Sequence, residues 1–150
     1  MSIAVRAAGV EDLNDLSEVY RRSSLSNEGD LEILLRHPEV LELSGEAVRE
    51  GRTWVAIDTE GVIVGFVSYL VVGGIFEIDD LFVDPPSMEQ GIGRELVDTV
   101  VALARAQSFD RVEVTANPHA QAFYERAGFR VGHVVETKFY PAHRMYRRTD

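Results

Sequence analysis

Apolar positions along the chain follow two periods, one typical of strands and one typical of helices. Short runs rich in Val, Ile and aromatic residues, bounded by Gly, Pro or Asp, predict strands. The predicted strands are Ile3–Arg6, Thr53–Ile57, Val62–Val72, Ile75–Val83, Arg111–Ala116, Val131–Lys138 and Arg144–Arg148. Where apolar residues instead return every three or four positions, the pattern predicts amphipathic helices between these strands.

Helical spacing occurs in four stretches. It runs through Leu13–Tyr20, then through Leu31–Glu50, which Pro38 should divide because proline lacks an N–H and clashes with the preceding turn. Gly91–Gln107 carries the clearest apolar stripe of the chain. In the last stretch Asn117 is a good N-cap with proline after it, and Gly128 stands where a helix usually ends.

The order of these elements predicts the fold class. Ile75–Ala116 reads strand, helix, strand, and such a crossover makes its two strands parallel. The three preceding strands are joined by short turns and should be antiparallel. We expect a single α/β (α+β) domain over residues 1–150. Its sheet should be mixed, mostly antiparallel and of six to seven strands, with helices on both faces.

Composition narrows the range of partners. The net charge is −10, from 25 acidic and 15 basic residues, which argues against nucleic acid and favours a cationic substrate such as an amine. Acidity that serves only solubility is the alternative. The chain has no cysteine, so disulfides, thiolate metal sites and a cysteine nucleophile are excluded. Without a signal peptide or an apolar stretch of membrane-spanning length, we expect a cytoplasmic protein that does not associate with membranes.

Two local motifs carry candidate chemistry. The turn Met88–Gly93 opens the clearest helix, and free N–H groups at a helix N-terminus bind phosphate well. Tyr124 lies in the next predicted helix, where its phenol could serve as an acid.

With these motifs the chain resembles the GNAT superfamily of acyl-CoA-dependent N-acetyltransferases. The matching segments are Leu81-Phe-Val-Asp-Pro85, Gln90-Gly-Ile-Gly93, Asn117-Pro-His-Ala120 and Phe123-Tyr-Glu-Arg-Ala-Gly-Phe129. Helices and strands follow in the family's usual order, so the resemblance covers essentially the whole chain and implies the GNAT fold.

The resemblance implies acetyl-CoA as the acyl donor. The pantetheine arm should run along Leu81, Phe82 and Val83, whose backbone groups can pair with its amides. The pyrophosphate should lie on the N–H groups of Glu89, Gln90, Gly91, Ile92, Gly93 and Arg94. Asn117, Ala120 and Tyr124 should also contact the cofactor. The family usually has glycine where this chain has Glu89, and Arg or Gln where it has Met88. A carboxylate beside an anion site should weaken CoA binding.

The resemblance also implies catalytic roles. Tyr124 matches the family's general acid, and a buried core aromatic is its alternative role. Glu77 lies closest to the position of the glutamate base in histone-type members, with Asp79 in reserve; both could instead be charges of a solvated strand. Asn117 could cap a helix as well as contact the cofactor.

The sequence therefore predicts an N-acetyltransferase that moves an acetyl group directly to a primary amine of a small molecule or peptide. The amine should enter over the loop from Ser23 to Asp30. Because of Met88 and Glu89, the alternative is a non-catalytic acyl-CoA-binding or interaction module on the same fold. We expect no metal, since no His, Asp or Glu cluster has ligand spacing, and a homodimer is left open.

Overall fold

The computed structural model describes residues 3–25, 36, 43–137 and 141–150. Most of the Leu31–Glu50 helical region, its division at Pro38, residues 26–30 of the predicted Ser23–Asp30 loop and Lys138 lie outside these residues. The first three residues of that predicted loop are instead the last three of a helix that ends at Leu25. Within the described part, the end of the Leu31–Glu50 region forms one short helix, α3 (Glu46–Arg49).

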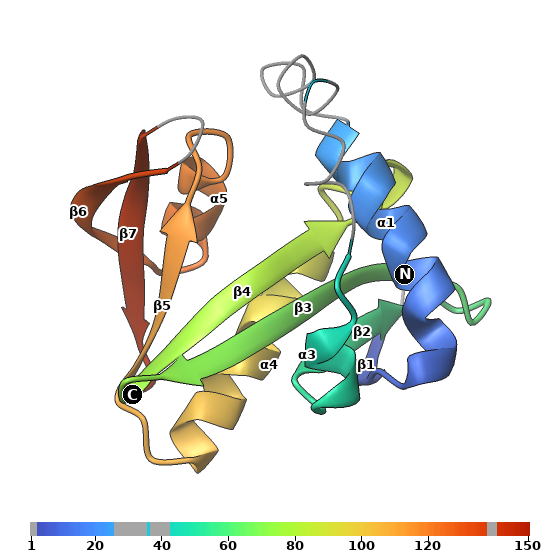
Figure 1. Cartoon of the computed structure of the whole chain (residues 1–150), viewed down its shortest axis with the longest axis horizontal. Coiled ribbons are helices and arrows are strands. Elements are labelled where there is room, and N and C mark those ends of the chain that lie inside the picture. The colour runs from blue at the N-terminus through green and yellow to red at the C-terminus, as the bar shows by residue number, and fades with distance from the viewer. Residues whose placement is uncertain (1–2, 26–35, 37–42, 138–140) are drawn as a thin grey trace. The chain divides into compact units, whose positions relative to one another are not determined.

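The strands form one seven-stranded sheet in the order β1-β2-β3-β4-β5-β7-β6 (Figure 1). Their bounds are β1 (Ala4–Ala7), β2 (Thr53–Ile57), β3 (Ile63–Val72), β4 (Ile75–Val83), β5 (Arg111–Ala116), β6 (Arg130–Glu136) and β7 (Pro141–Arg148). The remaining helices are η1 (Val10–Asp12), α1 (Leu13–Leu25), η3 (Pro85–Ser87), α4 (Ile92–Ala106) and α5 (Gln121–Arg126). No helix in the described ranges is both long and apolar enough to cross a bilayer.

Strand directions confirm the predicted fold class. β1 pairs with β2, β2 with β3, β5 with β7 and β6 with β7 in antiparallel fashion. β4 and β5, on either side of the α4 crossover, are parallel. The sheet is mixed, mostly antiparallel and accompanied by helices, as expected.

Backbone contacts divide the chain into two compact units. The first unit comprises Met1–Ser68 and Asp80–Leu96, and the second comprises Tyr69–Asp79 and Val97–Asp150. The single domain expected over residues 1–150 remains a prediction.

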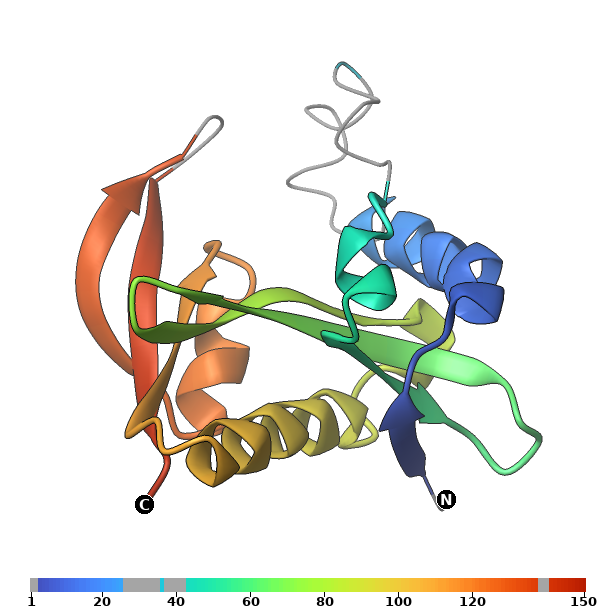
Figure 2. The same cartoon turned by 60° about the horizontal axis from the view of Figure 1, so that its bottom comes forward.

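In the first unit, helices lie on both faces of β2 and β3 (Figure 2). α1 and α3 cover one face, where Leu16, Val48 and Phe66 belong to one buried cluster. On the other face, a Cβ at Gly65 would lie 3.3 Å from both Ile92 and Leu96 of α4 and 3.0 Å from the carbonyl oxygen of Phe82. The missing side chain of Gly65 therefore permits the close approach of α4.

In the second unit, aromatic rings fill the space around the start of β4. Phe76 is fully buried and stacks on Tyr69 with ring centroids 4.6 Å apart. Phe109, just after α4, meets the Phe76 ring edge-on at 5.3 Å. Val112 of β5 and Met145 of β7 are also fully buried. This packing stabilises the start of the β4–β5 pair.

The last helix ends as predicted but begins later. Gly128 has a φ of 94°, its N–H donates to Glu125 and that of Phe129 donates to Tyr124, which is a Schellman cap. However, α5 starts at Gln121 and not next to Asn117. The Asn117 side chain accepts the Ala120 N–H at 2.9 Å, and its carbonyl accepts the same N–H at 3.1 Å. These bonds span three residues, so Asn117 caps a turn tighter than an α-helix ahead of α5.

Candidate active site

The end of β4 supplies the strand segment predicted to hold the pantetheine arm. Leu81, Phe82 and Val83 are half-buried. The parallel ladder between β4 and β5 pairs Phe76 with Val112, Glu77 with Glu113 and Ile78 with Val114. Leu81–Val83 therefore lie beyond the last β5 pair of that ladder, although β4 continues through them.

The turn before α4 has an unusual backbone. Glu89 has a φ of 64°, in the left-handed region that strongly favours glycine, and Gly91 has a φ of 82°. A Cβ at Gly91 would meet nothing within 4 Å, so this residue leaves open space above the turn. The family's usual glycine at position 89 would suit this conformation, and the glutamate found there is strained.

The first turn of α4 follows directly. The Gly91 carbonyl accepts the Glu95 N–H at 3.1 Å, so Gly91 is the first acceptor of the helix and Glu95 the first donor. The N–H groups between these two residues have no acceptor within the helix. Ile92 and Gly93 are buried, while Gln90 and Arg94 are exposed. Ile92 and Gly93 thus pack into the protein, and the side chains of Gln90 and Arg94 face solvent.

A bidentate ion pair ties α1 to the segment leading into this turn. Arg22 donates from Nε to one oxygen of Asp84 at 2.9 Å and from an Nη to the other at 3.0 Å. Asp84 in turn donates its N–H to the Val64 carbonyl at 2.8 Å and accepts the Ser87 N–H at 2.8 Å. Asp84 therefore joins α1, β3 and η3.

Aromatic contacts in the same unit place α1 against the end of β4. The Tyr20 ring meets Phe82 edge-on at a centroid distance of 4.8 Å. Burial raises the pKa of the Tyr20 phenol, and the negative charge of Asp80 raises it further. A phenol and a carboxylate thus lie together beside the predicted pantetheine strand.

In the second unit, Glu77 belongs to an ion-pair network centred on Arg144 of β7. Arg144 donates to Glu77 at 2.5 Å, to Glu113 at 3.0 Å and to the Thr115 hydroxyl at 2.9 Å. Glu77 and Glu113 are paired positions of the parallel ladder, so their carboxylates are close neighbours. Burial acts against the charge of Arg144, but hydrogen bonds to both glutamates outweigh it and raise its pKa above the usual value.

The reserve base candidate has a different environment. Asp79 is exposed, whereas the Glu77 side chain is only 26% exposed. Glu77 thus has a held orientation and a compensated charge, while Asp79 is open to solvent. As a base, Glu77 would be a carboxylate held in place by Arg144, whereas Asp79 would be a carboxylate in contact with solvent.

Tyr124 is buried near the middle of α5. It is 6% exposed, and its ring meets Phe123 and Phe129 edge-on at 5.1 and 5.2 Å. Ala120, just before α5, is half-buried, and His119 is exposed. The ring of Tyr124 is therefore fixed by its neighbours, as a positioned acid or a core aromatic would be.

The predicted site residues fall into two groups, one in each unit. The first unit brings together the candidate cofactor residues Leu81, Phe82, Val83, Glu89, Gln90, Gly91, Ile92, Gly93 and Arg94. The second contains Glu77, Asp79, Asn117, Ala120 and Tyr124. Tyr20 contacts Phe82 of the first group and Arg144 contacts Glu77 of the second, and neither contact was predicted. Arg22, also not predicted, binds Asp84, which directly follows Val83. Their partners are 62 residues away in the sequence for Arg22 and 67 for Arg144, so local spacing held no signal for them.

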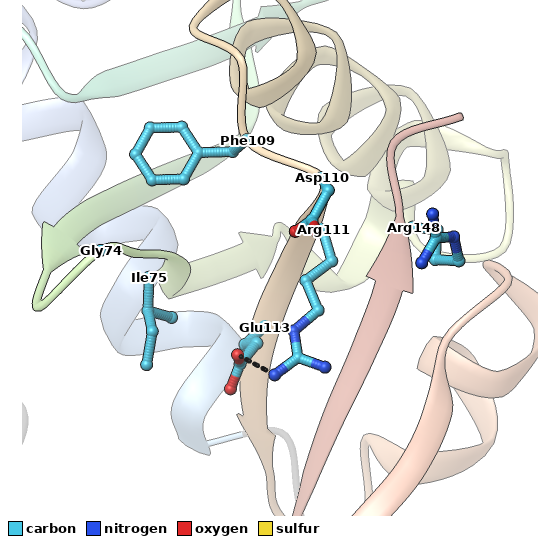
Figure 3. A pocket seen from close by; sticks show the side chains of 7 residues that line it. All are labelled: Gly74, Ile75, Phe109, Asp110, Arg111, Glu113 and Arg148. Atoms are coloured by element: carbon cyan, nitrogen blue, oxygen red, sulfur yellow. Dashed lines mark ion pairs between the residues drawn. The ribbon is translucent and has the colours of Figure 1, made fainter.

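A pocket of about 280 Å³ lies elsewhere in the second unit (Figure 3). It is lined by Gly74, Ile75, Phe109, Asp110, Arg111, Glu113 and Arg148. Arg111 and Glu113 form an ion pair of 3.1 Å at its wall. None of the predicted cofactor or catalytic residues lines this pocket.

Comparison with known proteins identifies the family. The sequence model of the Acetyltransferase (GNAT) family matches residues 13–129, so the chain belongs to this family of acyl-transferring enzymes. It is 33% identical over 131 residues to the peptidyl-lysine N-acetyltransferase YjaB of Salmonella typhimurium, covering 87% of this chain and 86% of that protein.

Solved structures agree on the fold. The solution structure of apo YjaB from Escherichia coli matches with a TM-score of 0.76 and 26% identity, over 97% of both chains. The PaiA N-acetyltransferase of Thermoplasma acidophilum, crystallised with coenzyme A, matches with a TM-score of 0.79 and 20% identity, over 99% of both chains. The chain is thus an N-acetyltransferase of the GNAT type.

The residues present fit coenzyme A in most respects. The helix start at Gly91, open space at that glycine and the Arg94 side chain suit a pyrophosphate. The exposed carboxylate of Glu89 opposes it, and Met88, also exposed, offers no hydrogen-bond donor where the family usually has Arg or Gln.

Proposed function

We propose that this enzyme transfers an acetyl group from acetyl-CoA to the side-chain amine of a lysine in a peptide or protein, or to a similar primary alkylamine. The observation that carries the proposal is the 33% identity to a peptidyl-lysine N-acetyltransferase along nearly the full length of both chains. The acidic character of the chain supports a cationic acceptor, with a net charge of −10 and three carboxylates on β4, those of Glu77, Asp79 and Asp80.

In this proposal the first unit binds the donor. Backbone groups of Leu81–Val83 pair with the amides of the pantetheine arm, and the turn from Glu89 to Arg94 receives the pyrophosphate. When bound, acetyl-CoA supplies an activated thioester carbonyl. The N–H of Leu81 or Phe82 is the candidate donor to the oxyanion that develops there.

The second unit supplies the proton chemistry. An alkylammonium has a pKa of about 10.4 and must lose a proton before its nitrogen can attack. Glu77, oriented by Arg144, is the lead candidate to accept that proton directly or through water, and Asp79 is the alternative. Tyr124 donates its phenol proton to the departing thiolate, so that coenzyme A leaves as the thiol. The resulting phenolate takes the second proton that the acetylated nitrogen must lose, and Glu77 releases the first proton to solvent, so both side chains return to their starting states.

Thiol release from acetyl-CoA tests the proposal. A lysine peptide with a blocked N-terminus should support turnover, and the same peptide with an acetylated lysine should not. The panel should include a polyamine, a free amino acid and a peptide whose only amine is its N-terminus. Binding of CoA by calorimetry without thiol release for any amine would instead favour the non-catalytic acyl-CoA-binding module.

A further inference from the structure

The pocket of the second unit and the candidate base Glu77 lie on the same face of the sheet. Glu77 pairs with Glu113 across the β4–β5 ladder, and Glu113 and Arg111 are two residues apart on β5. Arg111 in turn pairs with Arg148 across the β5–β7 ladder. Paired residues, and alternate residues of one strand, project to the same face of a sheet. Charged side chains therefore extend from the pocket to Glu77 along a single face.

The walls of the pocket are apolar on one side and charged on the other. Ile75 at the start of β4 is 37% exposed, and Phe109 is half-buried. Figure 3 shows these two side chains on the β4 side of the pocket and Arg148 on the β7 side. Arg111 and Glu113 of β5 lie between them. The pocket's volume of about 280 Å³ is at the lower end of the roughly 300–1,000 Å³ typical of ligand sites, so it suits one small amphipathic metabolite.

The pocket offers one positive and one negative group with unused hydrogen-bonding capacity. The Arg111 guanidinium meets Glu113 through one Nη at 3.1 Å and lies over the Tyr146 ring at 5.3 Å. Its other nitrogens have no hydrogen-bond partner within the described ranges, and neither does the exposed carboxylate of Asp110. A guanidinium binds a carboxylate through parallel N–H donors, and a carboxylate accepts hydrogen bonds from an ammonium. An α-amino acid carries a carboxylate and an ammonium on one carbon, so it matches both groups.

We propose that this pocket is a regulatory site for an α-amino acid with an apolar side chain. The ligand's carboxylate binds Arg111, its ammonium binds Asp110, and its side chain packs against Ile75 and Phe109. A simple anion would be repelled by Asp110, and a simple cation would be repelled by Arg111. A zwitterion avoids both repulsions, which gives the site its selectivity.

Glu113 connects the pocket to the candidate base. One of its oxygens contacts Arg111 at 3.1 Å, and the other accepts a hydrogen bond from Arg144 at 3.0 Å. Arg144 also donates to Glu77 at 2.5 Å. The side chains of Glu113 and Arg144 are only 11% and 16% exposed, so water and salt screen these charges weakly. A change of charge at Arg111 therefore alters the interactions of Glu77.

Binding of the amino acid should lower the activity. Its carboxylate shares Arg111 with Glu113, so Glu113 interacts more strongly with Arg144 and draws it away from Glu77. Glu77 then loses the contact that orients it. This inhibition rests on the proposed function, in which Glu77 receives the proton of the amine, whereas binding of the ligand does not depend on it.

Calorimetry with leucine tests the site without any reaction. Leucine should bind, whereas N-acetylleucine without the ammonium, leucinamide without the carboxylate and glycine without the apolar side chain should each bind about tenfold more weakly or worse. Asp110→Asn and Arg111→Gln should each weaken leucine binding to a similar degree. The control Arg130→Gln changes an exposed arginine of β6 outside the pocket and should bind leucine as the wild type does. No binding of leucine at millimolar concentration, or undiminished binding by Asp110→Asn, would overturn the proposal.

Thiol release with the lysine peptide as acceptor tests the regulation. Saturating leucine should lower kcat about fivefold or more, while the KM values for the peptide and for acetyl-CoA stay the same. Asp110→Asn should keep the basal kcat and lose the response to leucine. A raised apparent KM for the peptide together with acetylated leucine would place leucine at the acceptor site and overturn the proposal.

Two further outcomes separate this inference from the proposed function. Bound leucine that leaves kcat unchanged would refute the regulatory role alone. An enzyme that releases no thiol with any amine would refute the proposed function, and the calorimetric result for leucine would still decide whether the pocket binds an amino acid.

Discussion

Arg22 of α1 grips both carboxylate oxygens of Asp84, 62 residues away, at 2.9 and 3.0 Å. Asp84 is the residue at which β4 passes into η3, so the pair controls the path of the chain toward the proposed pyrophosphate turn. Its importance should therefore lie more in cofactor binding than in stability.

Replacing Arg22 with lysine keeps the charge but removes the two-pronged contact. We expect the KM for acetyl-CoA to rise about three- to tenfold, with a stability loss under about 1 kcal/mol because Arg22 is 49% exposed. Arg6→Lys is the matched control, since Arg6 grips Asp12 in the same bidentate way at 2.8 and 3.0 Å. An Arg22→Lys enzyme with the wild-type KM would show that the pair is merely structural.

Glu89→Gly should improve both stability and CoA affinity. It removes a side chain from a left-handed backbone, a strain of about 1 kcal/mol that glycine's greater freedom in the unfolded chain partly offsets. It also removes a negative charge beside the proposed pyrophosphate site.

Two control variants separate these effects. Glu89→Gln removes the charge and keeps the strain, so it should tighten CoA binding without stabilising the fold. Ser108→Gly relieves a similar φ of 69° after α4 and should change only the melting temperature. If neither change at position 89 improves the calorimetric Kd for CoA, the charge does not reach the cofactor.

Tyr124→Phe should lower kcat by about 10²-fold or more while the KM for acetyl-CoA changes little. The substitution keeps the ring contacts with Phe123 and Phe129, so the variant should fold. Tyr146→Phe is the control, because it deletes a phenol from β7 outside the proposed site. Unaltered turnover in a chemistry-limited assay would assign Tyr124 to the core alone.

Arg144→Gln should destabilise the protein by about 1–3 kcal/mol, because it leaves the carboxylates of Glu77 and Glu113 side by side without their shared cation. Glu77→Gln in that background should recover part of the loss, as urea denaturation can measure. Arg148→Gln removes an exposed ion pair with Asp150 and should have no measurable effect. Additive losses in the double variant would contradict the network.

Asp12 should contribute to the acid sensitivity of the fold. A hydrogen bond from Arg6 lowers the pKa of Asp12, and the Gly9 N–H lowers it further, although burial opposes both. The stabilisation is therefore complete above the ordinary aspartate pKa of about 3.9 and is lost as the pH falls toward the lowered value. Asp12→Asn should flatten the dependence of unfolding free energy on pH in that range, and an unchanged acid limb would exclude this role.

The strands were the part of the fold that the sequence predicted best. Thr53–Ile57, Ile75–Val83 and Arg111–Ala116 have the predicted bounds, because glycine, proline or aspartate stands at or near their ends. The predicted start of α5 at Asn117 was wrong. The Asn117 side chain and carbonyl both accept a hydrogen bond from the Ala120 N–H, so the residues after Asn117 form a tighter turn and the helix begins only at Gln121. Strand β7 begins three residues before the predicted Arg144, at Pro141.

The candidate site was predictable only where it is continuous in the sequence. The turn from Glu89 to Arg94 could be found from its glycines, but its left-handed Glu89 could not. Partners such as Arg144 depend on which strands become neighbours, and β7 lies next to β5 although β6 intervenes in the sequence. Strand order, and not residue spacing, determines such pairs.

Gly65 limits how far the start of α4 can lie from β3 and from the end of β4. Because a single methyl group there would meet Ile92, Leu96 and the Phe82 carbonyl at 3.0–3.3 Å, the helix start and the strand end have no slack between them. Gly65→Ala would shift the helix start by only tenths of an ångström. That small displacement would occur between the strand end proposed to bind the pantetheine arm and the helix start proposed to bind the pyrophosphate. Gly65 therefore determines how far apart these two proposed binding segments lie.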